Sequence, residues 1–270
     1  MDTKNIIAAI SLSAAVIILY SLFFAPAPQE RKQIQSKENI TNESTDAPSL
    51  EQNELVSKIS REEAIIEESR ILFENDNVQG SISLKGSSID DLTFKKYTKT
   101  LNGKDNIVLL NPKQVENGYY VDTGWVTTNK NIEIPSSKTI WKIEGNNKLT
   151  PNSPVKLIWT NDDDITFEKK ITIDNQYLFT VNQTIINNSG KTYDFYTYGQ
   201  IIRNKAPEVT NFYILHEGLL GVFDDQLSEE DYDDIEEKKY SKNAQSGWLG
   251  ITDKYWLTSL IPEKDKSFRS

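Results

Sequence analysis

The sequence predicts a mainly β protein, in which an N-terminal transmembrane helix precedes a large antiparallel β-sandwich. Residues 6–25 form one uncharged, apolar run. From about residue 70 onward, apolar side chains recur with a period of two, which is typical of strands. Clusters of Asn, Asp and Gly separate these strands at regular spacing without alternating helices, and this favours a sandwich over a parallel α/β fold.

The apolar run at residues 6–25 has the length of a membrane span. A rise of about 1.5 Å per residue makes it roughly 30 Å long, the thickness of a bilayer hydrocarbon core. A continuous helix also satisfies every backbone hydrogen-bonding group in lipid. The predicted anchor side chains are Ile6, Ile7, Ile10, Leu12, Val16, Ile17, Ile18, Leu19, Leu22, Phe23 and Phe24.

A cleaved signal peptide is the main alternative to an uncleaved anchor. Lys4 supplies a short positive region, and residues 25–27 have the small side chains of a cleavage site. The apolar run is longer than a typical signal sequence, however, and Pro28 would directly follow the cut. A buried helix of a soluble domain is a further alternative. Lys4 lies before the apolar run, and Arg31 and Lys32 lie after it. The positive charges are therefore nearly balanced and leave the orientation of the helix in the membrane open.

Composition divides the chain into an anchor at 1–27, a polar tether at 28–60 and a domain at 61–270. The tether is rich in Gln, Glu, Asn, Ser and Lys and offers too little apolar surface to offset ordering entropy. Leu55, Ile59 and Ile66 recur near helical spacing, which predicts a helix where the tether ends.

Charge and residue counts exclude several functions. The formal net charge is −10, from 40 acidic and 30 basic residues, which argues against nucleic acid and anionic membrane surfaces as partners of the soluble part. The chain has no Cys, so disulfides and thiolate metal sites are excluded. The single His216 excludes any site that needs two imidazoles.

The first part of the domain predicts short antiparallel strands. Residues 70–74 and 78–84 form a hairpin around the turn at 75–77. Further strands are predicted at 89–97, 107–110, 119–127 and 139–143.

The clearest β pattern is a meander at 155–198, with turns at 174–176 and 187–190. One strand face carries Ile165, Phe167, Ile171 and Ile173. The returning strand carries Tyr177, Phe179, Val181 and Ile185. The third strand, 193–198, is aromatic on both sides, so its buried face stays open.

The C-terminal part predicts one helix and two strands. Residues 228–239 suit a helix capped by Ser228 with acidic residues in its first turn, and an exposed acidic strand or loop is the alternative. Strands are predicted at 247–251 and 255–261 around a turn at 252–254. The polar residues 264–270 predict no closing strand, so we expect the domain to continue beyond them.

No catalytic, cofactor or metal site is predicted. His216 and Glu217 could form an acid–base pair, but a pair bonded to backbone is the favoured interpretation. The acidic runs 162–164 and 224–237 lack the alternating ligands of a calcium loop, so solvated faces explain them. Trp159, Tyr177 and Tyr193 fall in strands, and core packing explains them before a carbohydrate groove does.

Five segments carry a resemblance to a known family: 1–10, 80–97, 166–187, 212–222 and 247–262. In this order they resemble the bacterial membrane-protein insertases of the YidC family. The last segment is the most specific. Its family-motif residues, expected to be structural, are Gly247, Trp248, Leu249, Gly250, Tyr255, Trp256 and Pro262.

The resemblance implies a cytoplasmic amino end, an anchor in the bacterial inner membrane, and a periplasmic domain with a twisted β-supersandwich fold. That fold is related in shape to sugar mutarotases without their activity. The resemblance also implies that the protein assists insertion and folding of nascent inner-membrane proteins, alone or with the Sec translocon. In the family, insertion belongs to a later bundle of five membrane helices. This sequence contains no second apolar run long enough to cross a membrane. We therefore expect an N-terminal piece of an insertase.

Two alternatives remain from the residues. One is a membrane-tethered periplasmic binding module for glycan or peptide, with aromatic side chains facing a groove. The other is a mutarotase-like enzyme that uses His216 and Glu217 together in a cleft.

Overall fold

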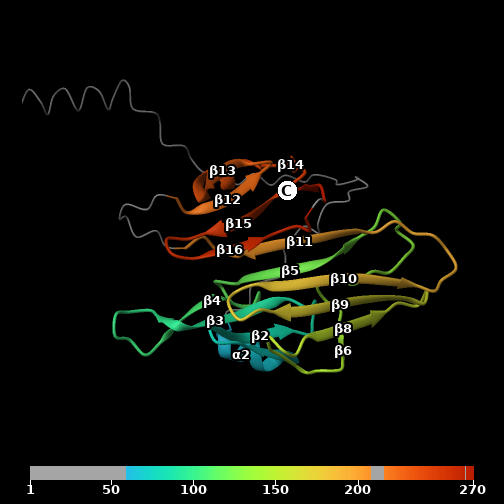
Figure 1. Ribbon diagram of the computed structural model, residues 1–270, viewed down its shortest axis with the longest axis horizontal. Helices are drawn as coiled ribbons and strands as arrows, with labels where there is room; N and C mark the ends of the chain where they lie inside the picture. The colour runs from blue at the N-terminus through green and yellow to red at the C-terminus, as the bar shows by residue number, and fades with distance from the viewer. Residues whose placement is uncertain (1–58, 208–215, 265) are drawn as a thin grey trace, which may run out of the picture. The chain divides into compact units, whose positions relative to one another are not determined.

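The computed structural model describes residues 59–207, 216–264 and 266–270. These residues are mainly β, in several antiparallel sheets (Figure 1). Their helices are α2 (Arg61–Glu67) and α3 (Tyr232–Glu237). The predicted anchor, and the predicted tether up to residue 58, lie outside the described residues.

The largest described sheet, here called sheet A, has the strand order β11-β5-β3-β2-β1-β7, with β4 beside β3. Its strands are β1 (Arg70–Glu74), β2 (Val78–Ser83), β3 (Ile89–Thr98), β4 (Asn106–Leu110), β5 (Tyr119–Val126), β7 (Lys148–Leu149) and β11 (Tyr196–Arg203). The predicted β1–β2 hairpin is confirmed, with Ile71 opposite Ile82. The pairing of β1 with β7 is parallel.

A four-stranded sheet, here called sheet C, contains the predicted meander. Its order is β10-β9-β8-β6, with β6 (Lys142–Glu144), β8 (Val155–Thr160), β9 (Ile165–Ile173) and β10 (Phe179–Asn187). The predicted turn after β9 is confirmed, because the Asp174 carboxylate accepts hydrogen bonds from the backbone N–H groups of Gln176 (2.8 Å) and Leu178 (3.0 Å). The predicted apolar face of β9 is buried as well.

Aromatic contacts join sheets A and C. Phe73 of β1 packs edge-on against Phe179 of β10, with ring centroids 5.0 Å apart. Phe167 of β9 lies 5.2 Å from Trp125 of β5 and 5.6 Å from Phe195. Phe195 therefore faces the core, which settles the face that the sequence left open. Its strand begins only at Tyr196 and runs on to Arg203, later than predicted.

The C-terminal sheet has the order β13-β12-β15-β16, from β12 (Gly218–Phe223), β13 (Gln226–Asp231), β15 (Gly247–Thr252) and β16 (Leu257–Leu260). The predicted strands around the turn at 252–254 are confirmed. At this turn, Arg203 from the end of β11 donates to both carboxylate oxygens of Asp253, at 2.6 and 2.8 Å. Leu260 of β16 occupies the space beside Gly199 of β11.

Two predictions for the C-terminal part are wrong. Ser228 does not cap a helix, because residues 226–231 pair with β12 and Ser228 lies opposite Gly221. The helix α3 begins only at Tyr232, where ladder pairing stops. The last residues do contain a strand: β17 (Phe268–Arg269) pairs with β14 (Asn243–Ala244).

Helix α2 lies where the sequence predicts a helix, and charged side chains hold it to sheet A. Ser60 caps it, since the hydroxyl accepts from the Glu63 N–H at 3.2 Å while the Glu63 carboxylate accepts from the Ser60 N–H at 2.8 Å. Arg61 forms an ion pair with Asp91, which also accepts from the Ser81 hydroxyl at 2.6 Å. These contacts fix the point at which the chain enters the domain.

We expect Gly247→Ala to lower the free energy of unfolding by roughly 2–3 kcal/mol or more. Gly247 has φ +133°, and a Cβ there would overlap the carbonyl oxygen of Val222 on the paired strand. Gly190→Ala is the matched control, because Gly190 also has positive φ (+70°) but no neighbour within 4 Å of the added methyl. It should cost only about 1 kcal/mol. Urea unfolding followed by tryptophan fluorescence measures both, and equal losses would contradict the role of strand contact.

Candidate functional site

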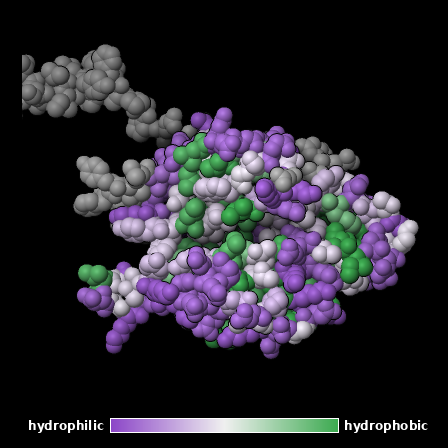
Figure 2. Space-filling view, viewed as in Figure 1, coloured by the Kyte–Doolittle hydropathy of each residue, from purple (hydrophilic) through white to green (hydrophobic). Residues whose placement is uncertain are grey.

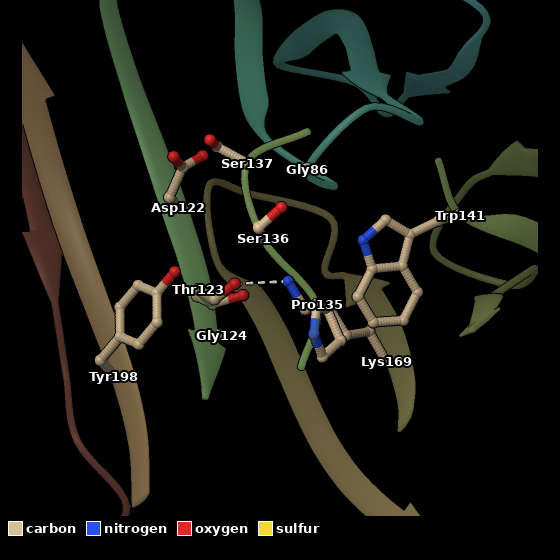
Figure 3. A pocket seen from close by; sticks show the side chains of 10 residues that line it. All are labelled: Gly86, Asp122, Thr123, Gly124, Pro135, Ser136, Ser137, Trp141, Lys169 and Tyr198. Carbon is tan, nitrogen blue, oxygen red and sulfur yellow. Dashed lines mark hydrogen bonds between the residues drawn. The ribbon is translucent and has the colours of Figure 1, made fainter. Parts of the chain in front are cut away.

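A buried lysine occupies the centre of the interface between sheets A and C (Figure 3). Lys169 stands on the apolar face of β9, between Phe167 and Ile171, and is 1% exposed. Its ammonium group donates to the carbonyl oxygen of Thr123, drawn as a dashed line, and to the hydroxyl of Ser87. Lys169 was not among the residues singled out from the sequence, although its place in the alternation of β9 was the available signal.

Two tryptophan rings surround the Lys169 ammonium. Its nitrogen lies 5.0 Å from the ring centroid of Trp141 and 5.7 Å from that of Trp125. The two rings are stacked, with centroids 6.2 Å apart. A cation over an aromatic face is attracted by the ring quadrupole, most strongly when desolvated, so the rings partly replace the lost water.

Burial shifts the protonation of this site. It lowers the pKa of Lys169 to about 7, and the nearby negative charge of Asp122 opposes this shift. Burial likewise raises the pKa of Asp122, opposed by the hydrogen bond from Ser88 and by the charge of Lys169. Both shifts have the same cause, because the interface disfavours either isolated charge.

The space beside Lys169 is too small for a substrate. The cavity has a volume of about 10 Å³, close to the minimum for one water molecule. Its walls come from Gly86, Asp122, Thr123, Gly124, Pro135, Ser136, Ser137, Trp141, Lys169 and Tyr198. The indole N–H of Trp141 is buried and has no hydrogen-bond partner among the described residues. This geometry suits a structural polar centre.

His216 and Glu217 make separate hydrogen bonds. The His216 Nδ1 lies 2.9 Å from a carboxylate oxygen of Asp231, and its Nε2 donates to the carbonyl of Leu219 at 2.9 Å. Glu217 instead accepts from the backbone N–H of Lys254 at 3.0 Å. Each group is engaged in a local structural contact, in agreement with the favoured interpretation.

A wider groove crosses β1, β2 and β3 beside α2, with a volume of about 350 Å³. It is lined by Arg61, Leu72, Phe73, Glu74, Gln79, Gly80, Asp91, Thr93 and Lys148. The aromatic residues considered for a carbohydrate platform do not line it. Trp159 and Tyr193 pack partly buried against the core, as predicted. Tyr177 is 47% exposed at the β9–β10 turn, so its predicted core position is wrong.

The family-motif residues lie in β15, in the turn between β15 and β16, and directly after β16. Gly247, Trp248, Leu249 and Gly250 belong to β15, where both glycines lie against the backbone of neighbouring strands. Tyr255 is 73% exposed at the turn. Trp256 stacks on Phe94 of β3 at 4.3 Å, and Pro262 follows β16. The motif thus brings the C-terminal sheet against sheet A.

The remaining predicted features concern the membrane and metals. The anchor side chains from Ile6 to Phe24 lie outside the described residues. Within the ranges that the structure describes, no helix is both long and apolar enough to cross a membrane. In the same ranges, no cluster of three or more His, Asp or Glu side chains could hold a metal ion.

The chain is similar to known proteins along its whole length. The YidC periplasmic domain family matches residues 70–270. Three relatives, each called membrane protein insertase YidC, are 58% identical over 270 residues (Pelagibacter ubique), 40% over 273 residues (Rickettsia prowazekii) and 36% over 297 residues (Brucella melitensis). These alignments cover 98–100% of this chain but only 48–49% of each relative. The chain therefore spans about half the length of the curated relatives that it matches.

We expect Lys169→Met to raise the free energy of unfolding by about 1–4 kcal/mol at pH 6. The pKa of Lys169 falls from its ordinary 10.5 to about 7 on folding. Below pH 7, Lys169 is charged in both the folded and the unfolded protein. The folded protein is therefore destabilised by the full free-energy cost of burying this charge. That cost disappears as the pH rises from 7 to 10.5, because the folded protein then holds a neutral amine. The advantage of the variant should shrink accordingly.

Urea unfolding at pH 6 and pH 9.5 measures this difference. Lys170→Met is the matched control, since Lys170 is exposed on the opposite face of β9, and it should leave stability and its pH dependence nearly unchanged. A Lys169→Met variant less stable than the native chain at pH 6 would show that the hydrogen bonds and ring contacts outweigh desolvation.

Proposed function

Because the chain belongs to the YidC family of membrane protein insertases, we propose that it forms the anchor and periplasmic part of such an insertase. The observation that carries this proposal is the collinear match over the whole chain, which includes the periplasmic domain at 70–270. The complete protein then assists insertion and folding of nascent inner-membrane proteins, alone or with the Sec translocon. This membership replaces the mutarotase-like enzyme alternative.

The proposed topology has three parts. Residues 1–27 cross the inner membrane with the amino end in the cytoplasm, 28–60 form a polar tether, and 61–270 form a periplasmic β-supersandwich. Support for the supersandwich comes from Leu260 of β16 beside Gly199 of β11, and from the Arg203–Asp253 pair. Both contacts align the C-terminal sheet with the edge of sheet A.

The geometry supports a contact role for these residues and leaves insertion to the rest of the protein. The cavity beside Lys169 holds no more than about one water, and His216 and Glu217 serve separate structural contacts. The described domain is instead organised by a hydrophobic core that includes several aromatic rings. We therefore assign anchoring and a periplasmic interaction surface to these 270 residues.

Genetic complementation tests the proposed function. In a bacterium depleted of its own insertase, the full reading frame that contains these residues should restore growth and the insertion of a membrane-protein reporter. Residues 1–270 alone should not. The Pelagibacter ubique relative serves as the positive control. Failure of the full reading frame where this relative succeeds would refute the proposal, and rescue by residues 1–270 alone would refute the assignment of insertion to the rest of the protein.

Charge substitution tests the anchor separately. Val16→Arg combined with Ile17→Arg should release the 270-residue chain from the membrane fraction in a carbonate wash, because each arginine costs about 2.5–3.5 kcal/mol at the centre of a span. Arg31→Leu with Lys32→Leu is the matched control outside the run and should stay with the membrane. Retention of the double-arginine variant would contradict a spanning helix.

A further inference from the structure

The hairpin formed by β3 and β4 projects from sheet A at the left of Figure 1. Its connecting turn is ordered by backbone hydrogen bonds from Lys99 to Asp105 and from Gly103 to Thr100, both 2.9 Å long. Asn102 adopts the left-handed conformation, with φ +66°. The tip is therefore a defined, narrow structure.

The tip of this hairpin presents an apolar side chain to solvent. Leu101 is 95% exposed, and Figure 2 shows a small apolar patch at the end of the hairpin, bordered by hydrophilic residues. Single exposed leucines are common on protein surfaces, so exposure alone does not indicate a partner. The surrounding charges and aromatic rings do.

The hairpin is basic although the chain is acidic. Residues 95–105 contain four Lys and one Asp, against a net charge of −10 for the whole chain. Lys95 pairs with Glu74 at 2.9 Å and Lys96 donates to Asn77 at 2.7 Å. The ammonium groups of Lys99 and Lys104 are exposed and have no partner among the described residues. Two available positive charges thus flank the apolar tip.

Partly exposed tyrosines lie on the hairpin and in the two turns that contact it. Tyr97 is 45% exposed and packs edge-on against Trp256 of the β15–β16 turn at 4.9 Å. Tyr177 of the β9–β10 turn meets Phe94 at 6.0 Å. Tyr255 is 73% exposed, with the Lys254 ammonium 5.2 Å from its ring. Rings with one apolar and one polar side, beside lysines, are typical of residues at a membrane–water interface.

We propose that this hairpin face rests on an anionic phospholipid bilayer, with the apolar tip at the boundary between headgroups and acyl chains. The hairpin face consists of Tyr97, Lys99, Leu101, Lys104, Tyr177 and Tyr255. The proposal builds on the proposed function in one respect, namely that the anchor holds the domain beside a bilayer.

Charge and area favour lipid over a protein partner. A narrow hairpin offers little of the roughly 800 Å² that each side of a stable protein interface buries, whereas a bilayer needs no matching pocket. The net charge of −10 argues against anionic membranes as partners, but a charge acts over only about 8 Å at physiological salt. The acidic segment of β13 and α3 lies well apart from the hairpin in Figure 1.

A single fluorescent label tests this proposal in the full 270-residue chain, reconstituted in lipid nanodiscs. The chain has no cysteine, so Leu101→Cys carries an environment-sensitive dye at one defined position. Discs containing phosphatidylglycerol should shift its emission to the blue and protect it from aqueous iodide, relative to pure phosphatidylcholine. Asn188→Cys, at the exposed β10–β11 turn, is the matched control site and should respond to neither lipid.

Charge reversal provides the second arm. Lys99→Glu with Lys104→Glu should weaken the contact roughly 30-fold, from about 1 kcal/mol per lysine at an anionic surface. Lys130→Glu with Lys191→Glu makes the same change in net charge at exposed sites elsewhere and should leave the dye signal unchanged.

Three outcomes would contradict the proposal. If the chain enters the discs but the dye at position 101 shows no emission shift, the hairpin contact is overturned while the anchor stays intact. An equal shift in phosphatidylcholine would overturn the requirement for anionic lipid. A shift that depends on protein concentration in detergent would assign the tip to a second copy of the chain and also overturn the proposal.

Discussion

The packing of β9 against sheet A is the constraint on which the rest of the fold depends. Phe167 fills the space between Trp125 and Phe195, and two residues further along Lys169 reaches the carbonyl oxygen of Thr123. A slip of one residue would turn Glu168 into this interface and expose Lys169. The apolar contacts and the buried ammonium therefore specify the same register, and a single polar centre can make that register unique even where it costs stability.

This strand also shows how far sequence reasoning reaches. Its alternation predicted the buried face correctly, and the same alternation placed Lys169 on that face. What the sequence could not supply was the set of partners, because Ser87 and Thr123 come from segments 82 and 46 residues away. The role of a lysine in an apolar pattern becomes clear only when the backbone and ring atoms that contact it, from distant parts of the sequence, are known.

The errors near the C-terminus have a related cause. Residues 226–231 are acidic and suit the start of a helix, but their backbone completes the ladder of β12, and tertiary pairing overrides local propensity. The two-residue strand β17 is too short to show a period, and it exists because Phe268 meets Ala244. Tyr177 was assigned to the core from its place beside Phe179, yet the strand begins only after the turn.

The attachment at α2 bears on how the domain would sit beside a membrane. The capping box at Ser60 and the Arg61–Asp91 pair fix the first described turn to sheet A. A flexible tether of the length proposed for 28–60 has an r.m.s. span of roughly 35 Å. Such a span confines the domain near the bilayer without orienting it. The orientation of the domain then requires a second contact with the bilayer. This contact can have a low affinity, because a short flexible linker holds the domain at an effective concentration in the millimolar range. A hairpin tip with one leucine and two lysines is a contact of that weak kind.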